Sequence, residues 1–434
     1  MRLNYDTILS LVPLCDLRTS MALISACRFL YHQGTKVLLH STRIVIKDEP
    51  QLVAFYRFLS AEKARRFDHV RNLSIDLWAN GQEAHPPIQV PPPFPQTLST
   101  LDEIIPFGLS LMHGLTHFEL CDAGPAFSRL PSLSESIGIF RTVTHLRLRR
   151  YSPDDLDLLA AAQFPTLVSV YCEFQGELWW HYGESKVWTT RHPLTFFRCS
   201  AVSLRELAFV NWTGTHEAHL SVDAFEDIEN DPLRAADLRV WPPVGAEVVY
   251  PNMRDFLLEY YHADEIPLIG PYVHAFPNLE RLAVAHRSPR FEGDAGVARE
   301  TARAENSAAL AREAADAGAA WPHLREFVGA AVELYALGIL GHVPRLTLAA
   351  RSWTSASDRL ARVLEDTHPV HVECDVDMYL CWIIKALKDA GADFLEVLEV
   401  HVDMVRLAQF IFRPSGYIEI LSVSASGTHG LITD

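Results

Sequence analysis

The sequence predicts an α/β solenoid, in which a short N-terminal helical unit precedes an irregular array of strands and helices. Three observations support this fold class. Apolar residues recur at helical spacing near the start, an apolar-x-x-apolar-x-apolar pattern recurs from about residue 70, and helix-forming stretches separate its copies. The chain has 434 residues. A single hydrophobic core stops growing at about 250 to 300 residues, whereas a solenoid adds repeats that pack on their neighbours.

Residues 1–45 are expected to form the helical domain, because their apolar side chains follow each other at intervals of three and four. Asp6 and Thr7 are candidate caps of the first helix, Pro13 limits that helix, and Asp16 is a candidate cap of the second. Residues 46–69 are expected to form a linker helix. Helices this short are marginal alone, so the unit requires packing against the rest of the chain or a partner.

Residues 70–434 carry the recurring pattern, whose last two-residue step is the alternation of a half-buried strand. Proline or another turn residue often precedes it. The pattern predicts strands near Val70–Ile75, Leu115–Leu120, Val143–Leu148, Leu167–Cys172, Leu204–Phe209, Leu279–Val284, Leu324–Phe327, Val343–Leu348, Leu395–Val400 and Ile418–Val423.

Helices are expected between these strands, for example near 152–161 and 377–387, and three segments interrupt the array. The first is the proline-rich loop 86–95, which is either a spacer or a docking motif. The aromatic loop 176–192 either covers the edge of the core or anchors a partner. The Ala-rich segment 287–320 is expected to form an exposed helix. The spacing from 204 to 279 is longer; much of this stretch is also expected to be an insertion, with a weak strand at 237–241.

The overall charge argues against two classes of partner. The chain has 38 basic and 54 acidic side chains and a formal charge of −16, so neither nucleic acid nor an anionic membrane is an expected partner. A local basic patch is possible at Arg147, Arg149 and Arg150. The seven cysteines include no CxxC pair, and the first residues do not resemble a secretory signal. These features predict reduced thiols and a cytoplasmic or nuclear location.

No motif in the sequence predicts a catalytic, cofactor-binding or metal-binding residue. The best metal candidate is a strand on which His371, Glu373, Asp375 and Asp377 share one face; the alternative is that this face is only the solvent side of the strand. His117 and His145 occupy the same place in two copies of the pattern, which indicates repeated packing or a shared surface. Cys121, Cys172 and Cys199 are expected to be small buried hydrophobic residues.

The N-terminal unit resembles the F-box motif. The segments that carry the resemblance read LNYDTIL from Leu3, PLCDLR from Pro13 and LISACRFLY from Leu23. Asn4 stands where the family usually has proline, and residues 29–31 replace its tryptophan region. The residues that match the family pattern are Leu3, Asp6, Ile8, Leu9, Leu14, Asp16, Leu17, Leu23, Cys27 and Arg28.

The array that follows is similar to the degenerate leucine-rich repeats found downstream of F-box motifs, especially in fungal proteins. The resemblance implies a non-catalytic substrate receptor that docks on the Skp adaptor of a cullin-RING ubiquitin ligase and holds an unknown target protein. It implies that the adaptor-binding residues are Leu3, Ile8, Leu9, Leu14, Leu17, Leu23 and Cys27.

Two alternatives remain open at this stage. In the first, the chain is a leucine-rich-repeat-like scaffold or recognition protein without a ubiquitin-ligase role, whose helices cap the end of the array. In the second, it is an enzyme with an unfamiliar site built on the strand that carries His371 to Asp377.

Overall fold

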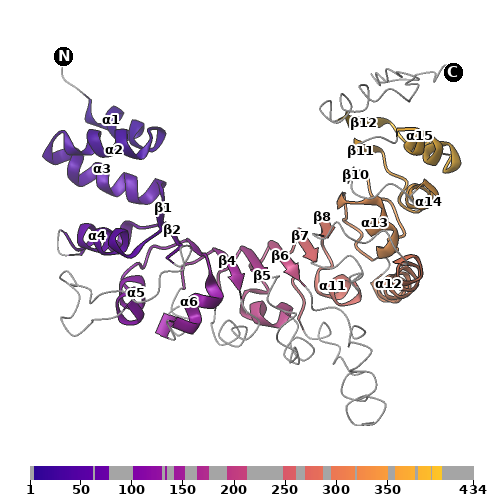
Figure 1. Ribbon diagram of the computed structural model, residues 1–434, viewed down its shortest axis with the longest axis horizontal. Coiled ribbons are helices and arrows are strands. Elements are labelled where there is room, and N and C mark those ends of the chain that lie inside the picture. Colours follow the sequence, from indigo (N-terminus) through magenta and orange to yellow (C-terminus); the bar gives the residue numbers. More distant parts are fainter. Residues whose placement is uncertain are drawn as a thin grey trace, which may run out of the picture. The chain divides into compact units, whose positions relative to one another are not determined.

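The computed structural model describes residues 4–61, 64–77, 101–129, 132–133, 141–151, 164–174, 193–212, 248–260, 269–286, 295–317, 320–349, 357–376, 380–391 and 393–402. The chain divides into two compact units, Met1–Leu204 and Arg205–Asp434. Both have an α/β fold with parallel strands, which confirms the predicted class at this level (Figure 1).

The first unit begins with helices, as predicted. They are α1 (Tyr5–Leu11), the short 3-10 helix η1 (Val12–Leu14), α2 (Leu17–Ser25) and α3 (Arg28–Ser41). Asp16 caps α2 by accepting a 2.8 Å hydrogen bond from the Thr19 N–H, and α1 ends just before Pro13, both as expected. The expected cap of α1 is wrong: the side chain of Asn4, rather than that of Asp6 or Thr7, accepts the capping hydrogen bond from the Asp6 N–H.

Five parallel strands follow in chain order within the first unit: β1 (Arg43–Ile46), β2 (Asn72–Ile75), β3 (His117–Leu120), β4 (His145–Tyr151) and β5 (Ser169–Phe174). Helices α4 (Glu49–Ser60), α5 (Leu101–Ser110) and α6 (Ala123–Arg129) lie in the connections, with short 3-10 helices η2 (Phe67–His69) and η6 (Pro193–Ser200). The first strand therefore begins well before residue 70, inside the segment assigned to the helical domain.

Seven parallel strands, again in chain order, form the sheet of the second unit: β6 (Glu206–Trp212), β7 (Asp255–Tyr260), β8 (Arg281–His286), β9 (Glu326–Gly329), β10 (Arg345–Leu348), β11 (His371–Val376) and β12 (Val397–Val402). The helices between them are α11 (Gly270–Ala275), α12 (Ala295–Ala317), α13 (Ala331–Leu337), α14 (Ser357–Thr367) and α15 (Leu380–Asp389), and they cover one side of the strands (Figure 1).

Every pattern copy that falls within the described residues coincides with a strand, and Ile418–Val423 lies outside them. The strand expected from His371 onward is β11, and the helix expected at 377–387 is α15. Strand β7 was missed. It lies in the presumed insertion, although Met253, Phe256 and Leu258 carry the pattern and are all buried. The segments 86–95, 152–161, 176–192 and 237–241 lie outside the described residues.

The three apolar positions of the pattern form the core of both units. In the β3 repeat, Leu115, Phe118 and Leu120 are all buried, and the corresponding residues of the neighbouring repeats are buried as well. Alternate strand residues point to opposite faces, so these side chains pack beneath the sheet while their neighbours occupy its polar face. Burial of apolar surface stabilises a folded protein by about 25 cal/mol per Å². This row of buried side chains therefore contributes strongly to the stability of each unit.

The same pair of backbone hydrogen bonds recurs where the chain enters most of the strands. The Arg71 carbonyl accepts from the N–H groups of both Thr116 and His117, each at 2.9 Å. Thr116 then plays the same role for the next repeat, and the carbonyls of Arg205, Arg254, Glu280, Pro344 and Val370 do so in the second unit. This corner explains why the first apolar residue of the pattern sits two residues before the strand. The Pro344 carbonyl accepts both bonds at the entry to β11, but proline has no N–H, so at the entry to β10 the Arg325 carbonyl accepts from Arg345 alone.

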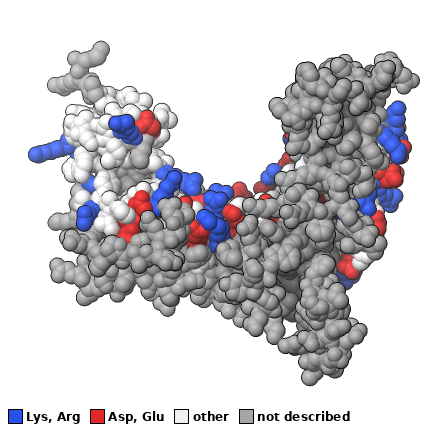
Figure 2. All heavy atoms as spheres, in the orientation of Figure 1, with Lys and Arg blue, Asp and Glu red and all other residues white. Residues whose placement is uncertain are grey.

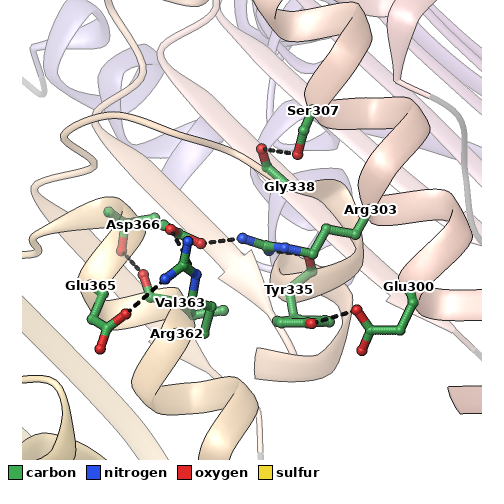
Figure 3. A network of polar contacts seen from close by, with 10 residues as sticks. Glu300, Arg303, Ser307, Tyr335, Gly338, Arg362, Val363, Glu365 and Asp366 are labelled. Carbon is green, nitrogen blue, oxygen red and sulfur yellow. Dashed lines mark hydrogen bonds and ion pairs between the residues drawn. The ribbon is translucent and has the colours of Figure 1, made fainter.

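The Ala-rich segment forms the helix α12, but this helix is not merely exposed. Ala302, Asn306, Ala309 and Leu310 are buried along one of its faces. At its centre Arg303 donates a 2.6 Å hydrogen bond to the Tyr335 carbonyl, forms an ion pair with Asp366, and places its guanidinium 4.4 Å from the centre of the Tyr335 ring (Figure 3). The helix is therefore part of the second unit.

Candidate functional site

The helical unit at the start of the chain has a small core of its own. Val12, Ile24 and Leu38 form a buried cluster. Gly34 of α3 permits the close approach of α2, because a Cβ atom at this position would lie 2.4 Å from Cγ2 of Ile24. The buried Ser20 hydroxyl donates a 2.8 Å hydrogen bond to the Val12 carbonyl, which joins α2 to the turn after α1.

The predicted adaptor-binding residues divide into different environments. Among those whose side chains the structure describes, Leu14 is the most exposed, at 81%. Ile8, Leu9, Leu23 and Cys27 are partly buried, so they contribute both to the internal packing and to the surface. Leu3 and the side chain of Leu17 lie outside the described residues.

Several other large apolar side chains of this unit are exposed, and the sequence interpretation did not assign them to its surface. They are Tyr5, Leu11, Met21, Phe29 and Tyr31. The rings of Tyr5 and Phe29 contact each other, with centres 5.1 Å apart, so α1 and α3 both contribute to this surface. Single exposed apolar residues are common in proteins, but a concentration of them marks an interaction surface.

The polar face of the sheet in the first unit carries alternating charges. Glu119 of β3 is buried and pairs with Arg43 of β1 and Arg147 of β4. Arg147 also stacks on Tyr171 of β5, with its guanidinium 4.3 Å from the ring centre. Figure 2 shows basic and acidic side chains of the first unit lying close to one another.

The possible basic patch is therefore largely neutralised within the unit. Arg149 lies 3.0 Å from Glu173, and Arg150 lies 2.6 Å from Asp122. Burial raises the pKa of Asp122, and the neighbouring Arg150 opposes this effect. Arg149 and Arg150 are about half exposed while their carboxylate partners are mostly buried.

The polar face of the second unit carries a ladder of ion pairs between successive strands. Arg281 of β8 lies 3.1 Å from Glu326 of β9, which also lies 3.8 Å from Arg345 of β10. Arg345 continues the ladder to Glu373 of β11 at 2.9 Å. The hydrogen bond from Arg345 to Glu373 raises the pKa of the arginine. Burial raises the pKa of Asp255 at the start of the ladder, and Arg281 opposes this shift.

The candidate metal strand belongs to the same ladder. His371 and Glu373 do share the polar face of β11, while Val372 and Cys374 are buried, as the alternation predicted. His371 Nε2 lies 3.4 Å from Glu399 of β12, and Glu373 is bonded to Arg345. The side chain of Asp375 and residue Asp377 lie outside the described residues. Among the residues that the structure describes, no three His, Cys, Asp or Glu side chains are arranged to hold a metal ion.

The cysteines divide by burial. Cys121 and Cys172 are buried, as expected, whereas Cys199 is exposed and the prediction for it was wrong. Burial raises the pKa of the Cys172 thiol to about 12, which keeps it protonated at neutral pH. Because the thiolate is the reactive form, Cys172 is inert as a nucleophile.

Within the described parts of the chain, no helix combines the length and apolar content that crossing a bilayer requires. A scan against protein-family models finds no match to this chain, and a search of the curated proteins finds no matching sequence.

Proposed function

We propose that this chain is a substrate-recognition subunit of F-box type. Its N-terminal helices dock on the Skp adaptor of a cullin-RING ubiquitin ligase, and its strand array, an irregular leucine-rich-repeat-like solenoid, binds a target protein. The observation that carries the proposal is the concentration of exposed apolar side chains on the helical unit, namely Tyr5, Leu11, Leu14, Met21, Phe29 and Tyr31.

The remaining exposed large apolar residues of the described chain are scattered, at Val45, Val202, Val249, Leu340 and Val397. A helical unit with more apolar surface than it can bury internally is suited to pairing with helices of another protein. The chain-order strands and the repeated hydrogen-bonded corner support the solenoid part of the proposal, because each repeat packs only on its neighbours. Ubiquitin transfer belongs to other subunits in this proposal.

Replacing Leu14 by aspartate is expected to abolish co-purification with the adaptor. A charged side chain in the centre of a desolvated interface costs at least about 2 kcal/mol, or roughly thirtyfold in Kd. Leu14 is a sharper probe than Leu9, because it is 81% exposed and its replacement leaves the internal core intact. The measurement is recovery of the adaptor with purified wild type and Leu14→Asp, together with circular dichroism of both proteins.

Val202→Asp is the matched control, because Val202 is 75% exposed but lies in the turn before β6, outside the helical unit. It is expected to recover the adaptor as wild type does. Equal recovery by Leu14→Asp, or no recovery by wild type under mild salt, contradicts the proposal.

A scaffold role without the ligase is the second candidate, and one buried residue favours it. Arg66 places its guanidinium 4.8 Å from the ring centre of Tyr31 on α3 and 4.5 Å from that of Phe58 on α4. It also donates a 3.0 Å hydrogen bond to the Phe58 carbonyl. These contacts join the helical unit to the first repeat, as a cap of the array requires. A stable array that recovers no adaptor supports this role.

A further inference from the structure

Two histidines on the polar face of the first unit are stacked on each other. His117 of β3 and His145 of β4 are register partners in the parallel sheet. Their ring centres are 4.0 Å apart and their planes differ by 9°. Adjacent parallel strands therefore hold two titratable rings face to face.

The threonine that precedes each histidine holds the ring through its Nδ1 atom. The Thr116 hydroxyl donates to the Arg71 carbonyl at 3.0 Å, and the Thr144 hydroxyl donates to the Thr116 carbonyl at 3.2 Å. Each hydroxyl also lies against Nδ1 of the histidine that follows it, 3.0 Å away in His117 and 2.9 Å away in His145. Nδ1 of each ring therefore has a hydrogen-bond partner that can donate or accept.

The charges around the stack do not compensate two positive rings. The facing residues of the neighbouring strands are Asn72 on β2 and Ser169 on β5, both uncharged. The nearest carboxylate along β3 is Glu119, which already pairs with Arg43 and Arg147. The Arg71 guanidinium donates to the carbonyls of Asp68 and Val70, and Tyr171 lies against Arg147.

We propose that the His117–His145 stack is an acid-sensitive element of the strand face, which accepts one proton and is disrupted by the second. One imidazolium can lie over a neutral ring, because a cation is attracted to an aromatic face. Two imidazolium rings held at the stacking distance repel each other, so the second proton destabilises the stack. This property goes beyond target binding and holds whether or not the helices dock on an adaptor.

The direction of the pH effect follows from proton linkage. Burial lowers the pKa of His117, and the neighbouring His145 lowers it further. In the unfolded chain His117 titrates near its ordinary value of about 6.5. Below that value the unfolded chain binds more protons than the folded pair, so stability falls as the pH falls towards the lowered pKa. When the folded pair binds one proton fewer than the unfolded chain, the folding equilibrium constant falls tenfold for each pH unit, or by about 1.4 kcal/mol.

A double-mutant cycle measured at several pH values tests the proposal on the full chain. The variants are His117→Asn, His145→Asn and the double variant, because the asparagine amide retains a hydrogen-bonding group near the position of Nδ1 and cannot titrate. Urea unfolding followed by circular dichroism from about pH 8 to about pH 5.5 gives the coupling between the two positions. The coupling is expected to become less favourable by at least about tenfold over this range. Burial and Lys36 also lower the pKa of His69. The cycle cancels the pH-dependent change in stability that His69 contributes, because this change is the same in all four proteins.

A cycle between His117 and His323 is the control, because His323 is exposed in the turn before β9 in the second unit. Its coupling is expected to be absent at every pH. Histidine NMR of the wild type provides a second measurement that requires no variant to fold, and it is expected to show two titration steps separated by more than about one pH unit. A coupling that does not change with pH, or two independent titrations with a common midpoint, overturns the proposal.

Discussion

Replacing Gly338 by alanine is expected to lower the free energy of unfolding of the second unit by about 3 kcal/mol. Gly338 ends α13 in the left-handed conformation, with φ of 61°. A Cβ atom there would lie 2.9 Å from the Arg303 carbonyl oxygen and 2.3 Å from the Ser307 hydroxyl. The left-handed conformation itself costs alanine about 1 kcal/mol. The larger part of the loss arises because the backbone of α12 must move away from the new methyl group. Urea unfolding followed by circular dichroism measures the loss.

Gly391→Ala separates these two contributions. Gly391 follows α15 and has φ of 59°, but no atom lies within 4 Å of the Cβ position. This variant is expected to lose only the conformational part, about 1 kcal/mol. The difference of about 2 kcal/mol between the variants then measures the packing of α12 on the end of α13. Equal losses for both variants contradict this packing.

Replacing Asn306 by leucine is expected to cost about 2 to 4 kcal/mol, because two buried backbone groups lose their partner. Asn306 of α12 is 1% exposed. Its side chain accepts a 2.9 Å hydrogen bond from the Ile269 N–H at the start of α11 and donates a 3.1 Å hydrogen bond to the Ala336 carbonyl of α13. One amide therefore joins three successive helices. Denaturant unfolding measured on the full chain gives the size of the effect.

Asn278→Leu is the matched control. The Asn278 side chain donates a 2.9 Å hydrogen bond to the Pro251 carbonyl, but this contact is exposed to solvent. Water replaces the lost partner there, so the expected cost is below about 1 kcal/mol. If the two variants lose similar stability, the buried position of Asn306 has no special role in joining the helices.

The strand positions could be predicted because their signal is local. Leu115, Phe118 and Leu120 lie at the spacing that one strand and its corner require, and this spacing places all three beneath the sheet. The same rule applied to Met253, Phe256 and Leu258 predicts β7, which was missed because the surrounding segment was treated as an insertion. The start of the sheet at Arg43 was missed for a different reason. Ile44 and Ile46 of β1 occupy the last two apolar positions of the pattern, but the first position is Ser41, so the pattern is incomplete there.

The surface of the helical unit could be predicted only in part. Val12, Leu14 and Ile24 are all apolar residues of the helical unit, and the sequence does not distinguish them. Val12 and Ile24 are buried, whereas Leu14 is exposed. Amphipathic periodicity gives the apolar face of one helix without saying which neighbour covers it. The same limit applies to α12, where composition predicted an exposed helix and the structure buries Asn306.

The sequence by itself determined the class of fold, the order of most strands and the apolar rows beneath them, because these depend on residues adjacent in the chain. Only the tertiary structure decided which apolar side chains stay uncovered on the helices, which carboxylate each arginine meets, and that His117 and His145 stack. These features depend on residues far apart in the chain, and the register of the sheet and the packing of the helices bring them together.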